Sequence, residues 1–395
     1  MRKTSWEEEI MSSLASCTQT VGHSGCCGII PEYMLRKLAE KEGDNQIKEI
    51  ALNTLGKDDR VRKERCQVQK EFHRRTFVPY NLSEISDSQT SVIKIYDAKR
   101  STQLPGTKIV SPDLSTDKAV VDIYRWAVKT DEFFRNIFER NSIDNNGMEV
   151  VSTVHYDRNY ANAFWNGSQM VFGDGDGKYI ASFTIDSDIY AHEYMHGVSQ
   201  FDTNLRYQDQ AGALNESISD VFGIMAKQSI QKETVDSSNW LIGEHLLVGG
   251  KYALRSMKNP GTAYRDHPVF GDDPQTASMD AYDDTLDDNG GVHINSGIPN
   301  KAFYLASTKL RDYDHERYAY TWNGTGRVWY EARQRVGSHP TFSDFASKTV
   351  EVAQELFGRE SNVEKACRYA WGDVKVELGS TPSPAPKPIE WCNLL

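Results

Sequence analysis

Several features that mark other protein classes are missing from this chain. It has no run of eighteen apolar residues, so we expect no membrane partner and no helix that spans a bilayer. The first nine residues, MRKTSWEEE, form no apolar stretch, so we expect no ordinary secretory signal. The net charge of −11 combines +2 up to Arg75 with −13 in the remainder. So acidic a body argues against a nucleic-acid partner, since nucleic-acid binding depends on basic surfaces.

Cysteine is absent from the central part of the chain. The six cysteines are at positions 17, 26, 27, 66, 367 and 392, so we expect no disulfide within the main body. Cys17, His23, Cys26 and Cys27 could suggest a metal site, but no second ligand pair follows at a suitable spacing. Ordinary thiols are the favoured interpretation of this group.

The residues that are present divide the chain into segments. Pro31 and the apolar residues after it predict one helix, and apolar residues from Ile47 to Leu55 predict another that ends before Gly56. Later segments change from strand-like to helical periodicity, and the tail is rich in proline. We therefore predict an α+β fold in five parts: a separable helical segment at 1–75, a polar linker at 76–90, a β-rich lobe at 91–186, a helical lobe at 187–378 and a tail at 379–395.

One short sequence carries metal chemistry. His192–Glu193–Tyr194–Met195–His196 is an H-E-x-x-H run. On a helix its two histidines lie one turn apart on one face, so both imidazoles can reach one ion. Glu193 points beside that ion and can take a proton from a water molecule that the metal activates. The motif predicts a catalytic zinc site, against the alternative of two solvated histidines.

A second helix supplies a third ligand. Glu216 and Asp220 are four residues apart in the sequence GALNESISD. A catalytic zinc takes three protein ligands and keeps one open position. One of the two carboxylates can bind the metal, while the other accepts the far N–H of a ligating histidine.

H-E-x-x-H followed by N-E-x-x-S-D resembles the thermolysin family of metalloendopeptidases. Two further stretches are similar to that family: 162–167 (NAFWNG), which resembles its substrate-binding edge strand, and 288–297 (DNGGVHINSG), which resembles its downstream histidine motif. The resemblance implies a two-lobed fold with the H-E-x-x-H helix at the floor of the cleft. It also implies one zinc ion, polypeptide substrates, a monomer and an extracellular location.

The resemblance implies a role for each matching residue. His192, His196 and Glu216 would bind zinc, with Asp220 orienting His192. Glu193 would act as general base and then as proton donor. The remaining roles are these: Tyr207 and His293 bind the oxyanion, Asp288 holds His293, Arg255 binds the carbonyl just past the scissile bond, and Asn162 and Ala163 pair with the substrate backbone.

The same resemblance implies a specificity. The positions that match the apolar pocket of the family are Phe183, Ile189, Ile242, Leu246 and Leu254. Such a pocket predicts cleavage on the amino side of Leu, Phe, Ile or Val. The glycine-rich stretch 173–177 lacks the lysine of a phosphate-binding loop and the ligands of a calcium-binding EF-hand, so a turn is expected there.

Residues 29–35 (IIPEYML) resemble the short propeptide of protealysin-like members of the family. This implies an inhibitory propeptide up to about Arg75 and a processing site between Arg75 and Val92. Glu32 replaces a proline that is usual in that signature.

Calcium is expected to matter less than in other members of the family. Lys227 and Asn239 stand where the family's double calcium site has acidic residues. We expect Lys227 to form ion pairs with Asp188 and Glu244 instead, and the double site to be lost.

Two other functions compete with an endopeptidase. A catalytically silent peptide-binding relative is one, although every catalytic position holds a competent residue. A zinc aminopeptidase is the other, but the sequence offers no acidic motif to bind a free amine.

Overall fold

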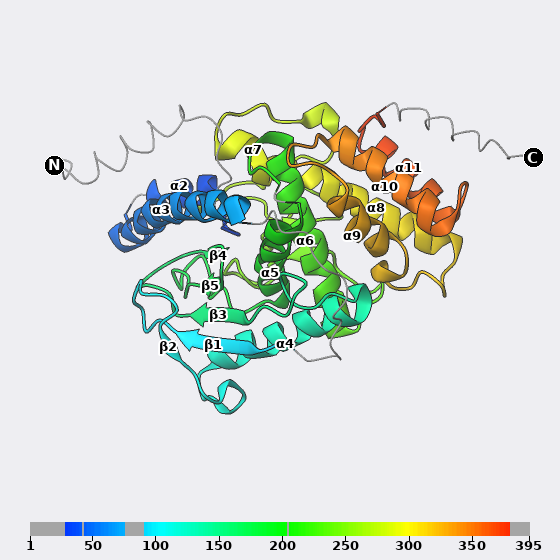
Figure 1. Ribbon diagram of the computed structural model, residues 1–395. Coiled ribbons are helices and arrows are strands. Elements are labelled where there is room, and N and C mark those ends of the chain that lie inside the picture. Colours follow the sequence, from blue (N-terminus) through cyan, green and yellow to red (C-terminus); the bar gives the residue numbers. More distant parts are fainter. Residues whose placement is uncertain (1–27, 42, 76–90, 204, 380–395) are drawn as a thin grey trace, which may run out of the picture.

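The computed structural model describes residues 28–41, 43–75, 91–203 and 205–379. The N-terminal cysteines, the predicted linker and the tail after Gly379 lie outside these residues. The described chain has a lobe built on a β-sheet and a lobe built of helices, with two N-terminal helices beside them (Figure 1). The predicted α+β architecture is therefore confirmed.

The first lobe is organised around a five-stranded mixed sheet with the order β2-β1-β3-β5-β4. Its strands are β1 (Ile93–Asp97), β2 (Thr107–Lys108), β3 (Val150–Val154), β4 (Ala163–Trp165) and β5 (Met170–Phe172). β1, β3 and β5 run parallel, while β2 and β4 are antiparallel to their neighbours at the two edges. β4 is therefore an edge strand of this sheet.

Helix α4 (Lys118–Phe138) packs on β1 and β3. Asp117 caps its first turn by accepting a hydrogen bond from the backbone N–H of Ala119 at 2.9 Å. The apolar face of α4, which includes Val120, Ile123 and Phe134, is buried. The β-rich lobe predicted at 91–186 therefore also contains one long amphipathic helix.

The second lobe is almost entirely helical. Its longer helices are α5 (Ser187–Asp202), α6 (Asp209–Gln231), α8 (Gly297–Tyr313), α9 (Thr325–Gln334), α10 (Phe342–Phe357) and α11 (Asn362–Asp373). A short helix α7 (Asp288–Asn295) and a two-stranded ribbon of β6 (Leu241–Ile242) and β7 (Arg255–Ser256) complete it. α5 contacts β4 and β5 on one side and α6 on the other, so it lies where the two lobes meet.

Helices α5 and α6 approach closely because a glycine lies at their contact. A Cβ atom on Gly223 of α6 would come within 2.9 Å of the backbone oxygen of Asp188 on α5. Only a residue without a side chain permits that spacing. Nearly every residue of both helices is buried, including the polar residues of the H-E-x-x-H and N-E-x-x-S-D motifs.

Two N-terminal helices, α2 (Glu32–Ala39) and α3 (Asn45–Arg75), lie beside β4 (Figure 1). The prediction that the second helix ends before Gly56 is wrong, because α3 continues to Arg75. The residues after Gly56 are mostly Lys, Arg, Glu and Gln, which all favour helix. Their propensity outweighs the cost of one internal glycine, about 1 kcal/mol.

Among the described residues, no helix combines the length and apolar character needed to cross a membrane.

Candidate metal and peptide-binding site

The structure brings the two histidines of the H-E-x-x-H run and Glu216 together. His192 and His196 come from α5 and Glu216 from α6. The Nε2 atoms of the two histidines are 3.0 Å apart. Glu216 oxygens lie 3.4 Å from His192 Nε2 and 3.5 Å from His196 Nε2. All three side chains are fully buried. Within the described residues, this is the group that could hold a metal ion.

The opposite side of each imidazole faces an acceptor. His192 Nδ1 lies 2.9 Å from Asp220 Oδ1, and His196 Nδ1 lies 3.0 Å from Asn215 Oδ1. An imidazole that donates from Nδ1 carries a lone pair on Nε2. Two such lone pairs beside a buried carboxylate repel one another unless a cation lies among them. The donor set therefore fits zinc, which prefers imidazole nitrogen and carboxylate oxygen.

The electrostatics of the site also favour a cation. Burial lowers the pKa of His192, but the carboxylates of Asp220 and Glu216 outweigh this and raise it to about 9. Burial raises the pKa of Glu216, but the imidazoles of His293, His192 and His196 hold it well below its ordinary value. Both shifts mean that positive charge is favoured beside the buried carboxylates of Glu216 and Asp220, and a metal ion supplies such charge.

A charged network supports Asp220. Arg255 donates from Nε and Nη2 to the two oxygens of this carboxylate at 2.8 and 2.7 Å, and Asn300 donates to Oδ2 at 2.9 Å. Against the effect of burial, Arg255 and His192 lower the pKa of Asp220 to about 2. Asn300 comes from α8, 80 residues away, and no local pattern predicts it. Asn215 and Ser219 lie inside the N-E-x-x-S-D motif itself, and Ser219 Oγ is 3.1 Å from His196 Nδ1.

Tyr207 and His293 approach the same centre from a third side. The Tyr207 hydroxyl donates to Glu216 Oε1 at 2.6 Å and lies 3.3 Å from His293 Nε2. The Asp288 carboxylate holds His293 twice: Oδ1 lies 2.8 Å from His293 Nδ1, and Oδ2 accepts from the His293 backbone N–H at 2.9 Å. Burial lowers the pKa of His293, but Asp288 and Glu216 raise it overall. Left-handed backbone at Gly290 and Gly291 turns the chain tightly between Asp288 and His293.

Glu193 follows His192 on α5 and is fully buried beside the metal-binding group. The predicted pocket residues Phe183, Ile189, Ile242, Leu246 and Leu254 are also buried, and they share one apolar cluster. Ile242 pairs with Arg255 across the β6–β7 ribbon, which links this cluster to the network around Asp220.

Residues of the N-terminal segment occupy the edge of β4 where Asn162 and Ala163 lie. The backbone N–H of Ile29 donates to Ala163 O at 3.1 Å, and that of Ile30 donates to Asn162 Oδ1 at 2.9 Å. Arg255 Nη1 donates to the Ile29 carbonyl at 3.1 Å. The sequence predicts the helices of this segment but not these contacts, because each contact joins residues that are far apart in the sequence.

Lys227 forms a second charged group between α5 and α6. Its Nζ lies 3.5 Å from Asp188 Oδ2 and 3.3 Å from Glu244 Oε2, and it donates to the Leu241 carbonyl at 3.1 Å. Burial lowers the pKa of Lys227, but Asp188 and Glu244 raise it overall. The expected ion pairs of Lys227 are therefore present.

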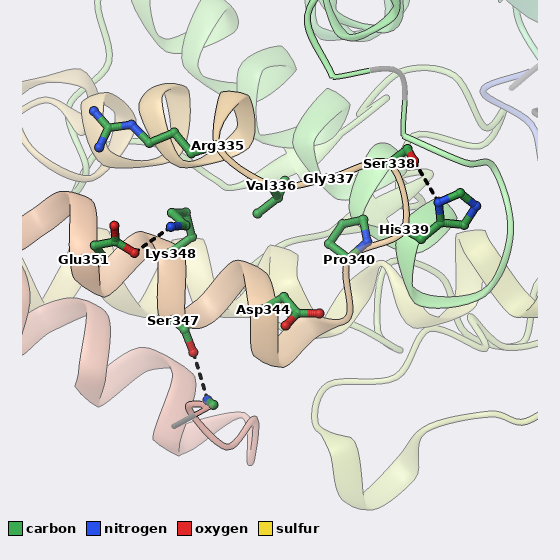
Figure 2. Close-up of a pocket in the computed structure, with 11 residues that line it drawn as sticks. Arg335, Val336, Gly337, Ser338, His339, Pro340, Asp344, Ser347, Lys348 and Glu351 are labelled. Carbon is green, nitrogen blue, oxygen red and sulfur yellow. Dashed lines mark hydrogen bonds and ion pairs between the residues drawn. The ribbon is translucent and has the colours of Figure 1, made fainter. Parts of the chain in front are cut away.

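A separate hollow of about 560 Å³ lies on the helical lobe, between the loop after α9 and the start of α10 (Figure 2). Its lining is mostly polar and includes Ser338 and His339, which hydrogen-bond to each other at 2.7 Å. The residues around the metal-binding group are not among those that line it. This hollow is therefore no part of the candidate active site.

Comparison with known proteins supplies a family context. A model of the thermolysin metallopeptidase catalytic domain matches residues 65–200, and a model of the thermolysin metallopeptidase alpha-helical domain matches residues 203–376. Protease PrtS of a Photorhabdus species is 39% identical over 89% of this chain and 92% of its own length. An extracellular metalloprotease of Pectobacterium carotovorum is 40% identical over 89% of this chain and 97% of its own.

A solved structure is similar over the same range. The precursor of protealysin, a metalloproteinase from Serratia proteamaculans, superposes with a TM-score of 0.75 at 41% identity. The match covers 89% of this chain and 99% of the precursor.

Proposed function

Since this chain belongs to the thermolysin family of metallopeptidases, with a protealysin-like relationship, we propose that it hydrolyses internal peptide bonds on the amino side of bulky apolar residues. The observation that carries this proposal is the buried group of two facing imidazoles and one carboxylate, next to an edge strand that already binds an extended peptide segment. A site of this kind can polarise a peptide bond that is held beside it as an added strand.

His192, His196 and Glu216 would hold the zinc ion that the family implies. When bound, zinc supplies a Lewis acid that polarises the substrate carbonyl and lowers the pKa of water. Asp220 and Asn215 fix the ring orientations of the two histidines through their Nδ1 atoms. Arg255 in turn fixes Asp220 through two hydrogen bonds.

Glu193 would take the proton from the attacking water and pass it to the departing amine. Tyr207 and His293 lie on the other side of Glu216, where they can donate hydrogen bonds to the oxyanion that develops on the substrate carbonyl. Asp288 holds the His293 ring through Nδ1 at 2.8 Å, which leaves Nε2 to face the oxyanion.

The apolar pocket of Phe183, Ile189, Ile242, Leu246 and Leu254 would accept the side chain just past the scissile bond. Arg255 would bind the carbonyl of that same residue, while Asn162 and Ala163 bind its backbone. The apolar lining favours Leu, Phe, Ile and Val, with modest discrimination among them.

The N-terminal segment would act as an inhibitory propeptide, so the full-length chain is a zymogen. Residues 28–30 already hold the hydrogen-bonding groups of Asn162, Ala163 and Arg255 that a substrate would need. Access therefore requires that this segment leaves. The name of the Pectobacterium relative supports an extracellular location for the active enzyme.

The double calcium site would be replaced by the Lys227 group. The Lys227 ammonium lies among Asp188, Glu244 and the Leu241 carbonyl. It neutralises the carboxylates that a calcium ion would otherwise bind, and Ca²⁺ needs six to eight oxygen ligands.

A peptide assay tests the proposed activity. The processed, zinc-loaded protein should cut an internally quenched, N-acylated peptide before a leucine, and a chelator should abolish the cut until zinc is restored. A protein that cuts only peptides with a free amine would be an aminopeptidase. A protein that binds the acylated peptide with no turnover would be the silent relative.

A further inference from the structure

An extended stretch of the N-terminal segment runs along β4 in a fixed register. Gly28 opposes Phe164 in an antiparallel bridge, and Ile29 and Ile30 follow with the hydrogen bonds to Ala163 O and Asn162 Oδ1. Asn162 returns a hydrogen bond from Nδ2 to the Ile30 carbonyl at 3.2 Å. These contacts are those of a strand added to a sheet edge.

The register places one particular peptide bond beside the metal-binding group. The Ile29 carbonyl accepts from Arg255, whose other nitrogens hold Asp220 and, through it, His192. Gly28, one residue earlier, lines a small cavity of about 10 Å³ together with Tyr207 and His293. The peptide bond between Gly28 and Ile29 therefore lies between Arg255 and the two oxyanion-binding candidates.

The carbonyl of Gly28 is directed away from the sheet. The hydrogen bond from Ile29 N to Ala163 O makes Gly28 and Phe164 a non-hydrogen-bonded pair. In such a pair the N–H and C=O groups of both residues point away from the opposite strand. The Gly28 carbonyl thus points away from β4, whereas the carbonyls of Ile29 and Ile30 accept hydrogen bonds from Arg255 and Asn162.

The side chains on either side of this bond fit the same register. Ile29 is fully buried in the main hydrophobic core, and Arg255, which donates to its carbonyl, pairs with the predicted pocket residue Ile242 across the β6–β7 ribbon. A Cβ atom on Gly28 would come within 2.3 Å of Asn162 Nδ2, so a side chain there would displace Asn162. The segment presents a glycine followed by a bulky apolar residue, which matches the proposed specificity.

We propose that the Gly28–Ile29 bond is a self-cleavage site of the zymogen, distinct from the cut that releases the mature enzyme. This inference rests on the proposed endopeptidase function. One water molecule is consumed and the C–N bond breaks. Gly28 leaves with a new carboxylate, and Ile29 gains a free amine that takes up a proton at neutral pH.

The shortened segment stays in place after this cut. Met34, Leu35 and Leu38 of α2 are buried in the main core, and Lys41 donates to the Pro268 carbonyl at 3.1 Å. Further along, Asp58 on α3 accepts from Asn162 Nδ2 at 2.8 Å. The cut at residue 28 therefore leaves the cleft blocked, and activity appears only after the later cut beyond Arg75.

The test follows the mass of the full-length chain after zinc is added to metal-free protein. A fragment that begins at Ile29 should appear at a rate that does not change on tenfold dilution. Glu193→Ala should yield none of it, Ile29→Asp should slow it by about tenfold or more, and Ile29→Leu should preserve it. A protein that hydrolyses an acylated peptide but leaves the Gly28–Ile29 bond intact, even if it cuts beyond Arg75, overturns the inference. A protein that cuts neither overturns the proposed function instead.

A second measurement tests the register without catalysis. In the inactive Glu193→Ala chain, Ile29→Asp should expose the N-terminal segment to trypsin at Lys41, because the aspartate cannot remain in the apolar cluster. Ile29→Leu serves as the matched control and should remain protected. Equal trypsin sensitivity of the aspartate and leucine variants would show that residue 29 is not seated there.

Discussion

The Tyr207 hydroxyl connects the metal-binding group to His293, so its loss isolates oxyanion stabilisation. In processed Tyr207→Phe we expect kcat to fall by about 10²–10³, because one donor to the developing charge is removed. KM should change by less than about threefold, and zinc content should stay at the wild-type level. Steady-state kinetics with a metal assay measure both. A raised KM with unchanged kcat would instead make Tyr207 a substrate-binding residue.

His155 joins the start of α4 to the loop after β5. Its Nδ1 lies 2.6 Å from Asp174 Oδ1 and its Nε2 lies 2.8 Å from Asp117 Oδ2. Asp174 and then Asp117 raise the pKa of His155 to about 9, against the effect of burial. The folded pKa exceeds the unfolded value of about 6.5. The contribution of His155 to the free energy of unfolding is therefore fully present below pH 6.5 and is lost as the pH rises through 9.

Urea denaturation of the full-length Glu193→Ala chain, with and without His155→Gln, measures this effect. The chain that retains His155 should be more stable by roughly 1–2 kcal/mol at pH 6, after allowance for screening by solvent, and by much less at pH 9.5. An equal difference at both pH values would show that the charge on His155 contributes nothing.

At the scale of elements, the Lys227 group lies between α5, α6 and β6, where we propose that it takes the place of a calcium ion. We expect millimolar Ca²⁺ to raise the melting temperature of the zinc-loaded protein by less than about 2 °C, because the remaining oxygens are too few for tight binding. The paired variant Lys227→Glu/Asn239→Asp should regain a calcium response. A rise of many degrees in the unaltered protein, abolished by Asp188→Asn, would contradict this interpretation.

The elements that carry chemistry were the most predictable part of the fold. The four-residue spacing of His192 and His196 dictates a shared helix face, and the same holds for Glu216 and Asp220. α5 and α6 both form where the two motifs predict helices.

Contacts between distant segments were much less predictable. Asn300 reaches Asp220 from a helix 80 residues away, and its sequence surroundings give no signal of this role. The predicted end of α3 before Gly56 was wrong, because the helix propensity of the charged residues that follow outweighs the cost of this one glycine.

At the scale of the whole molecule, α2 packs into the main hydrophobic core, and its Lys37 donates a hydrogen bond to the Phe270 carbonyl of the helical lobe. Leu35 is fully buried, so Leu35→Asp would place a charge in the core and detach the segment. We expect the full-length variant to hydrolyse a quenched peptide at least about tenfold faster than wild type at the moment zinc is added, whereas the exposed-site control Glu40→Ala should not differ. An unchanged initial rate would mean that the segment does not inhibit.

We propose that Glu193 carries the proton in catalysis and is not itself a ligand of the metal ion. The most direct measurement is the zinc content and self-processing of the full-length chain in three forms. Wild type should bind one zinc and process itself. Glu193→Ala should bind one zinc and remain full length, while His196→Ala should do neither. Loss of zinc from Glu193→Ala, or its processing at the wild-type rate, would contradict the central claim.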